Sequence, residues 1–274
     1  ASDVYKRQVI TATAALDSGS VTLNNHYSCS GRIHVADRFV RCANARGHGA
    51  QTFAQSLQNS CNPAFITWGL MTGKDNMVKY MESLGLYSKT GVDLPGEAGS
   101  IIHKTENIKE LDLAIMSFGQ SFQITPLQLL RAVSAVVNGG KLVTPHFGVK
   151  KIDTEGNISV LEYEESGTII KQSTTETMRG LLKNVVELGG GLNCRIEGYS
   201  IAGKTATSEK LPRGNGKYIA SFIGIAPAEN PQVIAMCIID EPVGMHYGGV
   251  IAAPVVKSLF ENILPYLGIE KGQT

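Results

Sequence analysis

The stretch at residues 199–210 reads YSIAGKTATSEK, and the interpretation of the fold starts from it. Ile, Thr and Tyr favour a strand, and the glycine before Lys204 allows another backbone to approach closely. Because side chains alternate along a strand, Lys204 and Ala206 are expected on one face, and Thr205 and Thr207 on the other. A cation flanked by hydroxyls at a sheet edge suits a substrate carboxylate and an extended peptide, although an edge strand with a protective lysine has the same pattern.

Two more strands follow this stretch, YIASFIGIAPA at residues 218–228 and QVIAMCIID at residues 232–240. Short turns join the three strands, which therefore predict an antiparallel sheet. Residues 248–267 are expected to form a terminal helix. Its inward-facing residues are predicted to be Val256, Leu259, Phe260 and Ile263.

Residues 49–73 are predicted to be helical, with an interruption before Pro63. Proline is excluded from a helix interior but is favoured in a first turn, so one helix should end near Asn59 and the next begin at Pro63. Asn62 is then placed as the N-cap. The pattern also allows a second interpretation, in which Ser60 and Asn62 project into a cleft from a tight turn.

Helical periodicity and turn residues define the other elements. Thr125 and Pro126 have the pattern of a cap and a first helical residue, and the helix should end at Gly139. The helix at residues 173–188 is expected to have its cap near Thr174 or Thr175. Further helices are predicted at residues 9–19 and 74–85, and a hairpin tip at residues 155–157.

Composition narrows the class of protein. The chain has 274 residues, of which 43% are hydrophobic and 18% charged, so it can bury a sizeable core. Its net charge of +1 indicates no polyanionic partner such as nucleic acid. No window reaches the roughly 18 apolar residues of a membrane span, and no secretory signal is visible.

The cysteines and histidines are scattered along the sequence. No close Cys-x-x-Cys pair is present, so a zinc site is not expected. Cys29 and Cys42 bracket a predicted hairpin at residues 30–41, and either a disulfide or two reduced thiols would fit. Cys61 has no obvious base to make it a nucleophile. His246 is interpreted as a loop histidine without metal partners.

The chain resembles the class B penicillin-binding proteins, the peptidoglycan DD-transpeptidases, over about residues 9–267. That fold family uses a Ser-x-x-Lys nucleophile, a Ser-x-Asn element and a Lys-Thr-Gly strand. This sequence has SCN at residues 60–62 and KTA at residues 204–206. Longer stretches that also resemble the family are SFGQSFQITPLQLLRAVSAVVNGG at 117–140, YIASFIGIAPAENP at 218–231 and YGGVIAAPVV at 247–256.

The resemblance implies an α+β penicillin-binding and serine β-lactamase-like transpeptidase fold. An antiparallel sheet flanked by helices would be combined with an all-helical subdomain at about residues 49–140. The transpeptidase domain is assigned to residues 9–267 and a tail to residues 268–274. Residues 1–8, ASDVYKRQ, lack the capped and patterned start that the following helix calls for, and are interpreted as a non-native scar.

Two departures from the family pattern are visible. The lysine of Ser-x-x-Lys should immediately precede Val9, which puts Gln8 at the lysine position and Tyr5 at the serine position. The nucleophile motif is therefore missing, and the chain is interpreted as a truncated fragment. Ala206 replaces the usual glycine of Lys-Thr-Gly. Two outcomes fit this change: the methyl group crowds a substrate strand, or it is tolerated because the residue is still small.

The resemblance also implies roles in a two-step acyl transfer. Ser60 would relay a proton towards the leaving amine, Lys204 would support it electrostatically, and Asn62 would bind the stem-peptide amide. Thr205 would bind the terminal carboxylate, beside Ala206. The backbone N–H of Thr207 would form half of an oxyanion hole.

Without a serine nucleophile and its base, the chain is predicted to be inactive, since a serine hydroxyl needs an adjacent base. No metal or organic cofactor is implied. The alternatives are a non-catalytic wall-synthesis scaffold related to penicillin-binding proteins, or a β-lactamase or DD-carboxypeptidase relative, although no glutamate is clearly placed to activate a hydrolytic water.

The family's partners would be peptidoglycan stem peptides, β-lactam antibiotics and membrane proteins of wall synthesis. Its location would be the extracytoplasmic face of the bacterial cell membrane, with an N-terminal anchor helix upstream of residue 1.

Overall fold

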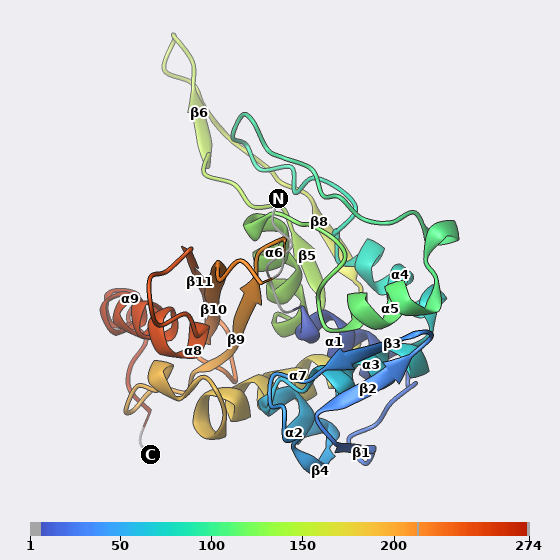
Figure 1. The fold of residues 1–274 in the computed structure, drawn as a ribbon. Coiled ribbons are helices and arrows are strands. Elements are labelled where there is room, and N and C mark those ends of the chain that lie inside the picture. The colour runs from blue at the N-terminus through green and yellow to red at the C-terminus, as the bar shows by residue number, and fades with distance from the viewer. Residues whose placement is uncertain (1–6, 213, 273–274) are drawn as a thin grey trace.

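The computed structural model describes residues 7–212 and 214–272. Its helices surround one three-stranded sheet, and four smaller strand pairs lie at the periphery (Figure 1). The α-helices are α1 (Gln8–Asp17), α2 (Phe53–Gln58), α3 (Asn62–Thr72), α4 (Lys74–Ser83), α5 (Glu110–Ser117), α6 (Pro126–Val137), α7 (Gln172–Leu188), α8 (Gly248–Ile251) and α9 (Ala253–Tyr266). The strands are β1 (His26–Cys29), β2 (Arg32–Val35), β3 (Arg38–Arg41), β4 (Gly49–Thr52), β5 (Lys141–Val143), β6 (Lys150–Ile152), β7 (Ile158–Val160), β8 (Glu165–Thr168), β9 (Ala202–Glu209), β10 (Tyr218–Ala226) and β11 (Val233–Asp240).

The main sheet has the order β11-β10-β9 and is antiparallel throughout, as predicted. Its strands are rich in β-branched residues and are joined by short turns, which favours pairing between sequence neighbours. Side chains from one face, such as Ile223, belong to the larger core with α1, α6 and α7. Side chains from the other face, such as Phe222, pack against α9 in a second core (Figure 1). β9 lies at one edge of this sheet.

A polar junction joins the C-terminal end of α1 to α4 and α7. Asp17 accepts a hydrogen bond from the Tyr80 hydroxyl at 2.6 Å and from the Lys171 backbone N–H at 2.9 Å. Lys171 also donates from Nζ to the Asp17 carbonyl. Lys171 is therefore the N-cap of α7, and the predicted cap at Thr174 or Thr175 is wrong, because both threonines are buried in its first turn.

The helix α6 begins as its sequence predicts. The Thr125 hydroxyl accepts from the Gln128 backbone N–H at 3.1 Å, and the Gln128 side chain accepts from the Thr125 N–H at 2.8 Å. This reciprocal capping box, with Pro126 in the first turn, satisfies two backbone donors that a helix start leaves unpaired. The predicted hairpin at residues 155–157 is also confirmed, and it carries β6 and β7 away from the body (Figure 1).

Three local predictions are corrected by long-range packing. Residues 49–52 are not helical but form β4, which pairs antiparallel with β1. Asn62 is the first residue of α3, and Cys61 occupies the N-cap. The terminal helix is divided at Ala252 into α8 and α9, where Leu259 is 43% exposed and the helix buries Leu264 instead.

Candidate active site

A cleft of about 840 Å³ runs along β9 and contains most of the residues that the sequence singled out. One wall is β9, which we call the strand wall. The other wall is the segment at residues 59–62, which connects α2 to the first residue of α3 and which we call the turn wall. The residues that line the cleft are Ala43, His48, Gln58, Asn59, Ser60, Gly189, Gly190, Leu192, Asn193, Thr205, Ala206, Thr207, Tyr218, His246, Tyr247, Gly249 and Val250.

The strand wall has the alternation that its sequence predicts. Lys204 and Ala206 are buried, whereas Thr205 and Thr207 are half-buried. Each residue of β9 from Ala202 to Glu209 pairs in register with β10, so the spacing of these side chains is that of a regular strand. Lys204 is only 3% exposed.

The buried lysine crosses from the strand wall to the turn wall. Lys204 Nζ donates a hydrogen bond to Ser60 Oγ and another to the Thr205 carbonyl at 3.2 Å. A charged amine is costly to bury unless hydrogen bonds satisfy it. The contact between Lys204 and Ser60 brings together two candidate residues that are 144 positions apart in the chain.

The turn wall has an irregular backbone. Ser60 has a φ of 50°, in the left-handed region that non-glycine residues seldom occupy. Cys61 is completely buried beneath it, and Asn62 begins α3. Such a conformation costs free energy and persists only where the surroundings hold it in place.

The start of α1 lies next to Asn62. Gln8 is buried, and its Nε2 donates to Asn62 Oδ1 at 3.4 Å. Arg7 is buried as well, donating from Nη1 to the carbonyls of Gly119 and Phe122. Position 8, to which the resemblance assigned the family lysine, therefore faces the turn wall, while Tyr5 lies outside the described residues.

The back of the cleft is closed by the stretch that follows His246. The Gly248 backbone N–H donates to Thr207 Oγ1 at 3.0 Å. A Cβ atom at Gly248 would overlap the carbonyl oxygens of Ala206 and Ser221, so glycine is required for this close approach. His246 itself stacks on Tyr218, with ring centroids 3.9 Å apart, at the rim of the cleft.

Sequence reasoning missed a second cluster, directly below the turn wall. Cys29, Cys42, His48 and Cys61 bring their side-chain donor atoms within 4.8 Å of one another. Because no Cys-x-x-Cys pair is present, the sequence predicted no zinc site and gave no sign that these four donors lie together. Spacing could not reveal them, because they come from separate segments and contain no Cys-x-x-Cys pair. None of the five cysteines forms a disulfide in the structure.

Solved structures identify the fold. The penicillin binding protein 3 of Mycobacterium tuberculosis, complexed with ampicillin, matches 99% of this chain and 63% of that chain with a TM-score of 0.89, at 22% sequence identity. This likeness places the chain in the class of proteins with a penicillin-binding transpeptidase fold, as the sequence predicted.

The family follows from the sequence comparisons. The family described as penicillin binding protein transpeptidase domain matches residues 8–261, and the chain belongs to this family. It is 37% identical over 270 residues to the stage V sporulation protein D of Bacillus subtilis, covering 96% of this chain. It is 31% identical over 269 residues to the probable peptidoglycan D,D-transpeptidase PenA of Neisseria flavescens, covering 94% of this chain.

The chain spans 42% of the length of the Bacillus relative and 63% of the Neisseria relative. Within residues 7–212 and 214–272, no helix combines the length and the apolar character needed to cross a membrane. The predicted family and α+β fold are confirmed.

Proposed function

We propose that this chain is the acyl-transfer domain of a peptidoglycan D,D-transpeptidase, and that its cleft receives stem peptides and β-lactams. The observation that carries the proposal is the hydrogen bond from Lys204 to Ser60 across the cleft, beside Asn62 and position 8. The name of the Neisseria relative, a probable D,D-transpeptidase, favours this activity over hydrolysis.

Lys204 and Ser60 suit proton transfer to a leaving amine. The lysine ammonium donates to the serine hydroxyl, which leaves the hydroxyl proton free to point into the cleft. A positioned donor of this kind contributes about 10²–10⁴-fold in proton-transfer steps. Asn62, at the start of α3, would hold the amide of the acyl donor from the same wall.

The strand wall suits an extended peptide. β9 is an edge strand, so its outer side presents backbone groups on which a peptide can add as a further strand. Thr205 would bind the terminal carboxylate, and the Thr207 backbone N–H would supply one oxyanion donor. The Thr207 hydroxyl already accepts from Gly248, and this contact supports the strand from behind.

The nucleophile is the missing part of the machinery. The family positions for serine and lysine fall on Tyr5 and Gln8, which are neither a nucleophile nor a base. Removing the nucleophile of a comparable acyl-transfer enzyme costs on the order of a million-fold in rate. The chain as written is therefore proposed to form no acyl-enzyme.

The test is covalent labelling with a fluorescent penicillin, read on a denaturing gel. The 274-residue chain should not be labelled, whereas the double variant Tyr5→Ser with Gln8→Lys should be labelled stoichiometrically. The matched control is Tyr5→Ser alone, which has a hydroxyl but no base and should label far more slowly. Labelling of the unaltered chain would refute its proposed inactivity. A correctly folded double variant that never labels would refute the proposed active site.

A non-catalytic role is the second candidate. It is favoured by the hydrogen bond between Gln8 and Asn62, because Gln8 occupies the position of the family lysine. In that case the cleft would bind stem peptide without turnover, and the double variant would still not react.

The location is part of the same proposal. Peptidoglycan is cross-linked outside the cytoplasmic membrane, so we place the domain at that extracytoplasmic face, anchored by an N-terminal helix and acting with membrane proteins of wall synthesis. Fractionation of cells that express the full-length protein tests this placement.

A further inference from the structure

The four donors of the Cys/His cluster converge from four segments of the chain. Cys29 ends β1, Cys42 follows β3, His48 precedes β4 and Cys61 caps α3. Their ligand atoms lie within 4.8 Å of one another, and Cys42 Sγ is 3.5 Å from His48 Nδ1. The three sulfurs are buried, whereas His48 is half-buried and lines the cleft.

These dimensions fit a tetrahedral metal ion. Zinc bonds to sulfur at about 2.3 Å and to nitrogen at about 2.0–2.1 Å, which separates tetrahedral ligands by about 3.6–3.8 Å. The distance between Cys42 and His48 already matches that separation. Three thiolates and an imidazole are soft ligands that favour zinc, and a Cys₃His set is a common structural zinc site.

The loops that carry the ligands are packed backbone to backbone. A Cβ atom at Gly47 would overlap the Cys29 carbonyl oxygen, and a Cβ atom at Gly31 would overlap that of Ala45. The Cys42 N–H also donates to the Gly31 carbonyl at 2.8 Å. Two glycine-containing loops thus hold ligands from separate strands at short range, with little freedom to move apart.

A buried amide lies against the cluster. The side chain of Gln51 is next to Cys61, and its amide nitrogen is buried with no hydrogen-bond partner of normal geometry in the described part of the chain. Hydrogen-bond donors beside a metal-bound ligand commonly orient it.

We propose that Cys29, Cys42, His48 and Cys61 bind one Zn²⁺ ion in a structural site beneath the turn wall. Binding replaces three S–H protons by three Zn–S bonds and releases the protons to solvent, while His48 binds through Nδ1 as neutral imidazole. The complex has a net charge of −1. A disulfide would use only two of the four donors, whereas zinc uses them all.

The site is joined directly to the cleft through Cys61, which lies between Ser60 and Asn62. A metal bond to this residue would hold the strained backbone of the turn wall in position. Ser60 and Asn62 are therefore carried by a metal-stabilised turn, while Cys61 itself is a positioning residue that does not touch substrate. This inference stands whether or not the chain is an active transpeptidase.

The experiment uses the 274-residue chain, purified under reducing conditions, with metal measured by elemental mass spectrometry. One zinc per chain is expected, and removal of zinc should lower the melting temperature. Cys42→Ser should lose the metal, whereas Cys237→Ser should keep it, because Cys237 lies on β11 outside the cluster. Equal zinc in both variants, or no zinc in the unaltered chain after exposure to Zn²⁺, would overturn the site.

A spectroscopic measurement keeps the test valid if Cys42→Ser does not fold. Cobalt titrated into the metal-free, unaltered chain should produce a thiolate-to-cobalt charge-transfer band and the intense visible bands of tetrahedral Co²⁺, saturating at one equivalent. Weak octahedral bands alone, or a thiol count showing that Cys29 and Cys42 are oxidised to a disulfide in the purified chain, would refute the proposal.

Discussion

The two walls of the cleft are built in different ways. The strand wall is a regular edge strand whose eight residues pair in register with β10. The turn wall is an interruption between two helices, with Ser60 at a φ of 50°. Local alternation is enough to place Lys204, Thr205 and Thr207, whereas nothing local holds Ser60 in its conformation.

The difference shows where the support of each wall comes from. The strand wall is held by backbone hydrogen bonds that any suitable strand sequence would make. The turn wall is held by side chains distant in sequence, namely Lys204 above it, Gln8 beside it and the Cys/His cluster below it. Substitutions in the strand wall should therefore change stability through local packing. Substitutions in the turn wall should change stability through contacts with residues that are distant in the sequence.

The largest expected effect is at the contact between the walls. In the double variant that carries Ser at position 5 and Lys at position 8, Lys204→Met should slow penicillin labelling by about 10²–10³-fold, because it removes a preorganised charge while nearly keeping the volume. The measurement is the second-order labelling rate. The control is Lys210→Met, which removes a half-buried lysine outside the cleft and should leave the rate within about twofold. Equal rates for the two variants would remove Lys204 from the site.

The strand wall should be sensitive to added volume. A Cβ atom at Gly203 would lie 2.5 Å from the Phe222 ring and 2.7 Å from the Ile223 carbonyl oxygen, so Gly203→Ala should lower the free energy of unfolding by about 1–3 kcal/mol. The matched change Ala206→Gly adds no volume and should cost about 0.5–1 kcal/mol through chain entropy. Urea denaturation measures both. If Gly203→Ala unfolded at the same urea concentration as the unaltered chain, the packing argument would be wrong.

At Ser60 of the turn wall glycine should be more favourable than alanine, which is the reverse of the order expected at Ala206 of the strand wall. Ser60→Gly and Ser60→Ala both remove the hydroxyl, but glycine tolerates a positive φ, so Ser60→Gly should be more stable than Ser60→Ala by about 1 kcal/mol. At Ser134, within α6, the order should reverse, because glycine is about 1 kcal/mol less favourable than alanine inside a helix. The same order at both positions in urea denaturation would contradict a left-handed Ser60.

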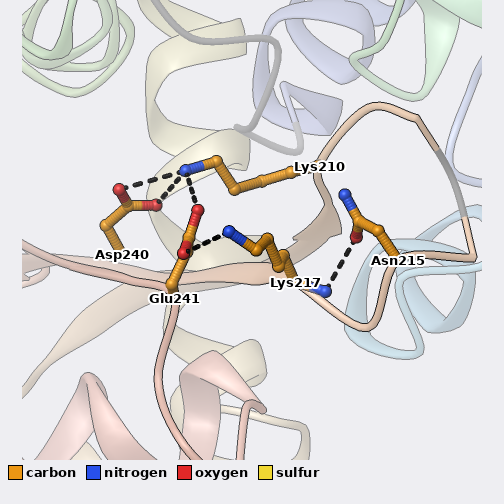
Figure 2. A network of polar contacts seen from close by, with 5 residues as sticks. All are labelled: Lys210, Asn215, Lys217, Asp240 and Glu241. Carbon is orange, nitrogen blue, oxygen red and sulfur yellow. Dashed lines mark hydrogen bonds and ion pairs between the residues drawn. The ribbon is translucent and has the colours of Figure 1, made fainter.

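The smallest expected effect is at the far end of the strand wall. Figure 2 shows Lys210 reaching Asp240 and Glu241, while Lys217 reaches Glu241. Hydrogen bonds from Lys210 and Lys217 hold the pKa of Glu241 below its usual range. A carboxyl with a depressed folded-state pKa stabilises the fold above its unfolded pKa of about 4.3, and that contribution disappears as pH falls through the folded-state value.

Glu241→Gln should therefore lower the melting temperature slightly at pH 7 and have no effect once the pH is below the folded-state pKa. High salt should also shrink the difference at pH 7, since exposed charges are screened. A difference that persists unchanged in acid and in high salt would show that Glu241 acts through packing instead.

Predictions from sequence succeeded where the residues that define an element are neighbours in the chain. Thr125 and Pro126 start α6 because the cap, the proline and Gln128 are neighbours. The predictions failed where contacts with a distant segment determine the local structure. β4 is too short to be recognised alone and exists because it pairs with β1. Leu259 has helical periodicity with the core, but the path of α9 across the sheet leaves it exposed.

In the candidate site, too, some features could be predicted from the sequence and others could not. The motifs at residues 60–62 and 204–206 were visible in the sequence, because a resemblance compares residues in chain order. That Lys204 donates to Ser60 could not be read from them, since the contact joins positions 144 apart.

By itself, the sequence determined the family, because motifs and longer stretches resemble it in chain order. It also determined the antiparallel strands and the residues of the strand wall, because strand periodicity and capping act between near neighbours. Only the tertiary structure decided the shape of the turn wall and the convergence of Cys29, Cys42, His48 and Cys61. The physical reason is that contacts between remote segments form when helices and sheet pack against one another, and no local spacing in the chain records which of them will meet.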